Sequence, residues 1–321
     1  MPSYSGVWTL TAQFQAVGQG LWPSFFISGN IALFMGGKNS SVETNVVNYT
    51  IITTTGNATY FGDLMSTGTG YSLAGGCASS TRGVVGGFGN ATGSGTIVNV
   101  IQYITITNLG NFSDFGDLTN ARDAAAACSS ETRGIFAGGY QPTIVNTIDY
   151  ITIASTGNAT SFGSLSVTRY GANGVQSTTR GCFGGGYTGA VFSNVIDYVT
   201  IASTGNATDF GDLTLIRAYA GTVCSSTRGC FGGGTGASNT NVIDYITIAS
   251  TGDATDFGDL TVARYPAGAG STTRGLFAGG LSTSNVIDYI TIASTGNATD
   301  FGDLTNTAYN NAGLSNCHGG L

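Results

Sequence analysis

Residues 261 to 304 read TVARYPAGAGSTTRGLFAGGLSTSNVIDYITIASTGNATDFGDL, and they indicate the architecture because close copies of them fill most of the chain. Each copy holds four short apolar runs and ends in an F-G-D-L or F-G-S-L block. Repeats of about 40–50 residues with four strands each are typical of a β-propeller, so the sequence predicts this architecture. The block recurs at intervals of 54, 47, 48, 47 and 44 residues, at Phe61, Phe115, Phe162, Phe210, Phe257 and Phe301.

Each unit reads as four strands, taken from the channel outward. In the last copy, the small residues of YPAGAGS suit the crowded innermost strand, and S-T-T-R-G makes a tight turn into a second strand, GLFAGG. The third strand is VIDYITIAS, and a T-G-N-A hairpin turn leads to the outer strand, TDFGDL. The third strand is apolar at nearly consecutive positions, which predicts a sheet covered on both faces by stacked blades.

The chain ends decide the blade count. Residues 21–37 are expected to supply two inner strands for the first unit, six full repeats span 21–304, and residues 305–321 form a partial repeat. Residues 1–20 are expected to hold a closing strand segment. The sequence therefore predicts one all-β domain over 1–321, a kelch-like propeller of seven blades closed by both ends, with six blades as the alternative.

The composition restricts the possible partners. Only 8% of the residues are charged, against about 25% in an ordinary domain, and the net charge is −7. This acidic balance argues against nucleic acid or an anionic membrane as a partner. No apolar stretch is long enough for membrane insertion, and the N-terminus does not resemble a signal peptide, so synthesis in a cytoplasm is expected. The six cysteines are expected to be buried free thiols.

Two resemblances add to this. A double glycine, a tyrosine about ten residues on and an aromatic residue about twelve later, as at Gly279-Gly280, Tyr289 and Phe301, resemble the kelch repeat, with Phe in place of the usual Trp. The repeat's arginine appears in four blade-to-blade connections, as Arg122, Arg169, Arg217 and Arg264. The phrase IDYITIASTGNATDFGDL is similar to repeats in virion structural proteins of tailed phages, marine cyanophages above all. The kelch resemblance implies a propeller but no particular function, because kelch propellers have many unrelated functions. The phage resemblance implies a location in a virion.

The sequence predicts neither an enzyme nor a cofactor or metal site. His318 is the only histidine, and no His, Cys and carboxylate cluster has metal-ligand spacing. Four N-A-T sequons fall in the same hairpin turn, whose backbone requirements explain them without glycosylation: Asn57, Asn158, Asn206 and Asn297.

Five of the repeats carry an arginine in the T-R-G motif at the same turn. We expect each of these arginines to pair with an aspartate of a nearby turn, and an anion site at the channel mouth is the alternative. The five are Arg82, Arg133, Arg180, Arg228 and Arg274.

The opposite face is predicted to bind the partner. Connections between blades and the variable loops between second and third strands meet there, and loops carry specificity more freely than strands. Aromatic side chains among Ser, Thr and Asn suit sugar stacking or a protein interface, whereas in the alternative reading the tyrosines only cap the blade core. The candidate binding residues are Tyr140, Arg169, Tyr170, Tyr187, Phe192, Arg217, Tyr219, Arg264 and Tyr265.

These observations together predict a non-enzymatic virion structural or attachment protein of a tailed phage. Its partners would be other virion proteins or a host surface polysaccharide, bound through one propeller face. The alternative is a cellular kelch-type lectin or protein-interaction module.

Overall fold

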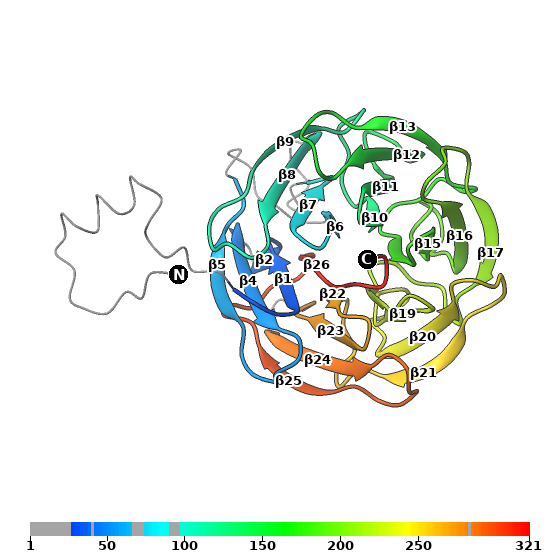
Figure 1. The fold of residues 1–321 in the computed structure, drawn as a ribbon. Coiled ribbons are helices and arrows are strands. Elements are labelled where there is room, and N and C mark those ends of the chain that lie inside the picture. Colours follow the sequence, from blue (N-terminus) through cyan, green and yellow to red (C-terminus); the bar gives the residue numbers. More distant parts are fainter. Residues whose placement is uncertain (1–26, 40–41, 66–73, 90–96, 282–283) are drawn as a thin grey trace, which may run out of the picture.

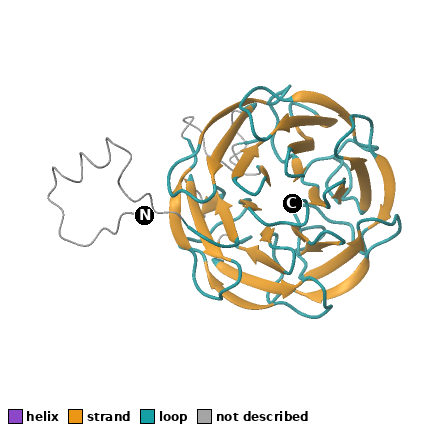
Figure 2. Cartoon of the chain, in the orientation of Figure 1, coloured by secondary structure: helices purple, strands orange, loops and turns teal. Residues whose placement is uncertain are grey.

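The computed structural model describes residues 27–39, 42–65, 74–89, 97–281 and 284–321. These residues form six four-stranded antiparallel sheets, arranged as blades around a central axis in an all-β propeller (Figure 1). Strands and loops make up the whole described part (Figure 2). It contains no helix that is long and apolar enough to span a bilayer.

The blades follow one another along the chain. Given from the innermost strand outward, the second to sixth blades are β6 (Gly75–Ala78), β7 (Arg82–Gly86), β8 (Val100–Thr105), β9 (Ser113–Asp117); β10 (Ala126–Ser129), β11 (Arg133–Tyr140), β12 (Ile144–Thr152), β13 (Thr160–Ser164); β14 (Asn173–Gln176), β15 (Arg180–Gly184), β16 (Val195–Thr200), β17 (Thr208–Asp212); β18 (Gly221–Cys224), β19 (Arg228–Gly232), β20 (Val242–Thr247), β21 (Thr255–Asp259); and β22 (Ala267–Gly270), β23 (Arg274–Ala278), β24 (Val286–Thr291), β25 (Thr299–Asp303).

The first blade combines segments from both halves of the chain. Its strands are β26 (Ala312–Ser315), β1 (Ile31–Met35), β4 (Val46–Ile51) and β5 (Thr59–Asp63), and a small hairpin of β2 (Lys38–Asn39) and β3 (Val42–Glu43) projects between β1 and β4.

Closure through this blade corrects the expected blade count. Strand β26 pairs with β1, with Leu314 opposite Leu33, so the C-terminal segment supplies the inner strand that residues 21–37 were expected to provide. The described part of 21–37 contributes one strand, the second of its blade. The seven-blade prediction is therefore wrong and the six-blade alternative is confirmed. The closing segment expected in residues 1–20 lies outside the described residues.

The apolar core lies between blades. One cluster joins Phe257 and Leu260 of the fifth blade to Phe277 and Ile290 of the sixth, and equivalent clusters occupy the other interfaces, including the one between the sixth and first blades. The third strand of each blade is thus covered on both faces, as its nearly continuous apolar run predicted.

Small residues allow the inner strands to meet closely around the axis. A Cβ atom added to Gly268 would lie 2.2 Å from the carbonyl oxygen of Thr222 in the neighbouring blade, and one added to Gly313 would lie 2.3 Å from that of Gly268. Glycine is therefore required at these two positions by the approach of neighbouring backbone. This crowding explains the small residues of the innermost strand.

The outer edge of each blade is capped by the next blade. Gly205 and Ala207, in the turn between β16 and β17, donate backbone N–H groups to the carbonyls of Phe162 and Ser164 in β13, at 2.9 and 2.8 Å. The side-chain Oδ1 of Asn206 accepts from the N–H of Ser164 at 3.1 Å. Equivalent bonds recur at the other five junctions. The outer strands therefore present few free backbone groups for pairing with another chain.

Candidate functional site

The propeller has two distinct faces. The turns between first and second strands, which carry T-R-G, and the turns between third and fourth strands lie on one face, called the turn face below. The loops between second and third strands and the connections between blades lie on the other, called the loop face. This follows from the antiparallel order of the four strands in every blade.

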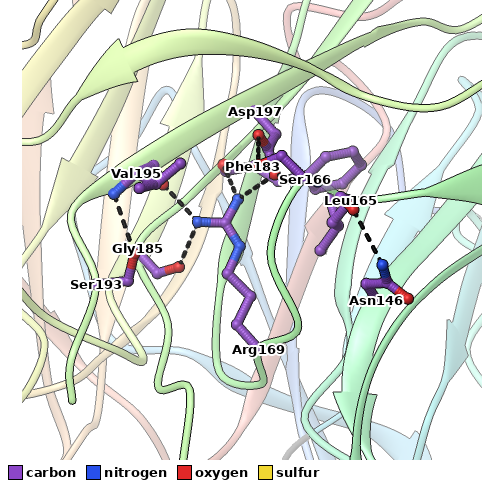
Figure 3. Close-up of polar contacts among 9 residues, drawn as sticks. All are labelled: Asn146, Leu165, Ser166, Arg169, Phe183, Gly185, Ser193, Val195 and Asp197. Carbon is purple, nitrogen blue, oxygen red and sulfur yellow. Dashed lines mark hydrogen bonds and ion pairs between the residues drawn. The ribbon is translucent and has the colours of Figure 1, made fainter. Parts of the chain in front are cut away.

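The arginines of the connections are buried. Arg169 has no exposed side-chain surface, and its Nη2 lies 2.9 Å from Oδ2 of Asp197 in β16 (Figure 3). The guanidinium also donates to the carbonyls of Phe183, Gly185 and Val195, and Ser166 donates to the same aspartate (Figure 3). Burial lowers the pKa of Arg169, and the Asp197 carboxylate opposes this shift. The arginine thus anchors the connection to the blade that follows it.

This arrangement corrects part of the predicted site. Arg169, Arg217 and Arg264 were expected on the partner-binding face, yet their side chains are at most 1% exposed and are ion-paired with aspartates. Arg122 forms the same kind of pair with Asp149. Their charged ends cannot reach a partner, because the following blade surrounds them.

The predicted aromatic residues of the loop face do come together. Tyr170 is central, with its ring centroid 5.8 Å from that of Tyr140, 5.7 Å from Tyr187 and 6.3 Å from Tyr219. The Phe192 ring lies 4.9 Å from that of Tyr187. We call these five residues the tyrosine cluster. Tyr140 is exposed and the other four are partly buried, so the cluster forms a continuous aromatic surface over the third and fourth blades.

Exposed aliphatic side chains extend this surface. Of the eight large apolar side chains that are exposed among the described residues, six lie on the loop face. They are Val42, Tyr140, Val191, Leu215, Ile216 and Val262. Apart from the buried arginines, the described loops and connections of this face carry three charged side chains, Lys38, Glu43 and Asp123. The loop face is therefore the less polar of the two.

The central channel opens in this face. A depression of about 50 Å³ at its mouth is lined by Tyr219, Tyr265, Asn173, Asn310 and Asn311, together with small residues. The rings of Tyr265 and Tyr309 pack edge to face at 6.1 Å. Sequence reasoning placed Tyr219 and Tyr265 at the mouth but missed the three asparagines, which occupy three successive positions of the repeat where a connection enters the innermost strand.

Asp123 was also missed. It occupies the position that Tyr170 and Tyr265 hold in other connections, and its side chain is only 9% exposed. Burial raises the pKa of its carboxyl to about 6. Because it departs from the repeat consensus, Asp123 could have been found by comparing the connections with one another.

The turn face is built differently from the prediction. The guanidinium of Arg180 stacks over the ring of Tyr198 at 4.3 Å, and its Nη1 donates to the carbonyl of Ile248 in the next blade at 2.9 Å. The other four T-R-G arginines repeat this geometry. Their role between blades is structural, as expected, but the expected aspartate partners are wrong. At this turn the guanidinium donates to a backbone carbonyl of the next blade instead of pairing with an aspartate.

Residues 316–321 close the channel at the turn face (Figure 1). His318 donates from Nε2 to the carbonyl of Ala78 at 2.9 Å and accepts at Nδ1 from Gln176 and from the N–H of Gly320. Gly319 donates to the carbonyl of Cys224. The Ser129 hydroxyl of the third blade also lies 3.3 Å from Nε2, so the segment bonds to the inner strands of the second, third, fourth and fifth blades. Burial lowers the pKa of His318 to about 4.

The remaining reactive side chains have structural surroundings. All six cysteines are free thiols, five of them buried, and burial raises the pKa of Cys77 and of Cys182 to about 12. Within the described ranges, no three His, Cys, Asp or Glu side chains lie close enough together to hold a metal ion.

Comparison with known proteins gives no assignment: no protein-family model matches the chain, and no curated protein matches it. Any statement about activity therefore rests on the site itself.

Proposed function

We propose that this chain is a non-enzymatic attachment protein that binds through its loop face. The observation that carries the proposal is the tyrosine cluster, in which ring contacts join residues from two connections, from the end of β11 and from the loop between β15 and β16. Aromatic side chains supply large contact areas at low entropic cost. Side chains that only pack the blades would recur in all six of them, whereas the tyrosine cluster lies over two.

The resemblance of the repeats to those of virion proteins of tailed phages supports a location on a phage particle. A capped propeller with few exposed backbone edges suits a component displayed on a surface. The partner on this reading is another virion protein or a host surface polysaccharide.

The proposal is tested on particles of the phage that encodes the chain. Mass spectrometry of purified particles should detect the chain, and an antibody to the loop face should label their surface. Particles that carry Tyr187→Ala with Phe192→Ala should adsorb to host cells at least fivefold more slowly. Absence of the chain from pure particles would refute the virion location.

A matched control keeps the test specific. Tyr60, an exposed tyrosine on the rim in β5, lies away from the loop face, so Tyr60→Ala should leave adsorption unchanged. Adsorption should also change little with moderate salt, because few charged side chains lie on the loop face. Equal effects of the double variant and of Tyr60→Ala would count against the loop face.

A further inference from the structure

The mouth of the channel is a closed-ended polar depression. A second cavity of about 70 Å³ lies deeper and shares Asn173, Pro266 and Asn311 with the depression at the mouth. Residues 316–321 cross the channel beyond it, with His318 lining the deepest space. A ligand therefore enters from the loop face and stops inside the ring.

Tyr219 is held at this mouth in a strained conformation. Its φ is 58°, in the left-handed region that aromatic residues rarely adopt, which costs on the order of 1–3 kcal/mol. The same position is Ala124, Gly171 and Asn310 in other connections, with φ values of 51°, 66° and 57°. Gly or Asn would meet the backbone requirement at lower cost, so the ring of Tyr219 is retained for something other than the turn.

Packing fixes where the Tyr219 ring lies. A Cβ atom added to Gly171 would lie 2.8 Å from the ring, so the neighbouring connection leaves room for it. The ring is also in contact with Tyr170 and thus joins the mouth to the tyrosine cluster.

The lining selects the class of ligand. It offers amide groups from Asn173, Asn310 and Asn311 and phenol groups from Tyr219 and Tyr265, and among the described residues that line it none is charged. The buried Oδ1 of Asn311 has no hydrogen-bond partner, which leaves an unused acceptor beside the channel. Neutral donors and acceptors beside aromatic rings suit a hydroxyl-rich neutral ligand, whereas an anion would find no cation there.

The volume limits how much of the ligand enters. A cavity of this kind needs about 10–15 Å³ to hold one water molecule, so a depression of about 50 Å³ has room for a few polar atoms, such as a hydroxymethyl group, and not for a whole sugar ring. The ring of a sugar would therefore stay at the rim, where the tyrosine side chains lie.

We propose that the channel mouth binds a neutral sugar residue, whose ring lies against Tyr219 and Tyr265 while its hydroxymethyl group enters the depression. This inference rests on the proposed function, because it names the ligand class of the same face. It makes the sugar, and not a protein, the ligand recognised at the axis of the ring.

The test uses the full chain and free sugars. Methyl glycosides of glucose, galactose, mannose and N-acetylglucosamine are titrated by saturation-transfer NMR, with N-acetylneuraminic acid as the charged comparator. At least one neutral glycoside should bind, and the charged sugar should not. Tyr219→Asn, which copies the residue at position 310, should weaken that binding at least fivefold without unfolding the ring. Tyr60→Ala should have no effect.

The outcomes separate this inference from the function it rests on. If no neutral glycoside binds, if the charged sugar binds equally well, or if Tyr219→Asn binds as the unchanged chain does, the sugar subsite is refuted. Slower adsorption by the Tyr187 and Phe192 double variant would still support attachment through the loop face in that case. Sugar binding lost in Tyr219→Asn alone, with normal adsorption by the double variant, would uphold the subsite and refute the attachment surface.

Discussion

At the scale of single residues, the buried arginine and its aspartate occur only as a pair. The four blades whose connection carries the arginine have aspartate in the third strand. In the first blade the same two positions are Ala308 and Asn48, and in the second blade the aspartate is replaced by Gln102 after a connection without arginine. Both amides bond to the connection instead. An unpaired buried carboxylate is costly, so both charges are lost together.

This pairing predicts a strong coupling. Arg169→Ala should lower the free energy of unfolding by about 3–5 kcal/mol, since it leaves Asp197 buried without a counter-charge. Adding Asp197→Asn should recover about 1–3 kcal/mol of that loss. Denaturant unfolding of the two single variants and the double variant measures the coupling. Additive losses would show that the carboxylate tolerates its isolation. Recovery should be partial, because three backbone carbonyls lose their donor as well.

The sequon asparagines act through one oxygen atom. Asn206 accepts from the N–H of Ser164, and in the equivalent turn Asp253 accepts from Asp212 in the same way. Asn206→Asp should therefore leave stability nearly unchanged, whereas Asn206→Ala should cost about 1 kcal/mol, the typical loss of one hydrogen bond. Thermal unfolding of both variants checks this, and equal losses would mean that the amide nitrogen matters.

At the scale of elements, each outer strand and the turn that caps it form a tight joint. In four of the F-G-D blocks the glycine has a positive φ and faces the neighbouring turn, at Gly116, Gly211, Gly258 and Gly302. For Gly211, whose φ is 143°, an added Cβ would lie 2.5 Å from the backbone of Gly252. The block repeats because each blade must receive the turn of the next.

Two glycines of this joint make a matched pair. Gly211→Ala and Gly252→Ala both place alanine at a positive φ, but an added Cβ at Gly252 meets nothing within 4 Å. We expect Gly252→Ala to cost about 1–2 kcal/mol from backbone strain. Gly211→Ala should cost about 1–3 kcal/mol more because of overpacking. Denaturant unfolding measures the loss of stability in both variants. Equal losses would show that the neighbouring turn shifts enough to accommodate the added methyl group at position 211.

At the scale of the whole molecule, the ring is closed by two segments far apart in sequence. Strand β26 completes the first blade, and the residues after it bond to the inner strands of four blades. His318 in that segment accepts two N–H groups at Nδ1, so its surroundings favour the neutral ring.

This burial predicts a loss of stability in acid. The pKa of His318 falls from 6.5 to about 4 on folding, so the unfolded chain binds a proton first as the pH decreases. Above pH 6.5 the histidine is neutral in both states and does not affect the free energy of unfolding. Between pH 6.5 and about pH 4, that free energy should fall by about 1.4 kcal/mol for each unit by which the pH decreases. His318→Gln should lack this part of the acid sensitivity. Parallel stability curves for both chains between pH 7 and 4 would contradict it.

The sequence by itself determined the repeat, the four-strand unit and the side of the ring on which each loop lies, because these depend on local alternation and turn residues. It also placed Tyr170, Tyr187, Phe192 and Tyr219 on one face. The contacts between their rings depend on the relative orientation of neighbouring blades, and the sequence of a single repeat does not specify that orientation.

The blade count and the partners of the arginines depend on contacts between distant parts of the chain, and they follow only from the folded ring. Leu314 meets Leu33 across nearly the whole chain, and no local pattern specifies that pairing. A guanidinium on a long side chain reaches groups in more than one blade, so sequence spacing left the partners of Arg169 and Arg180 open. The partner of Arg169 could have been inferred, because the two units that lack the connection arginine also lack the aspartate of the third strand. The partner of Arg180 could not, because the position of the Ile248 carbonyl depends on how whole blades stack.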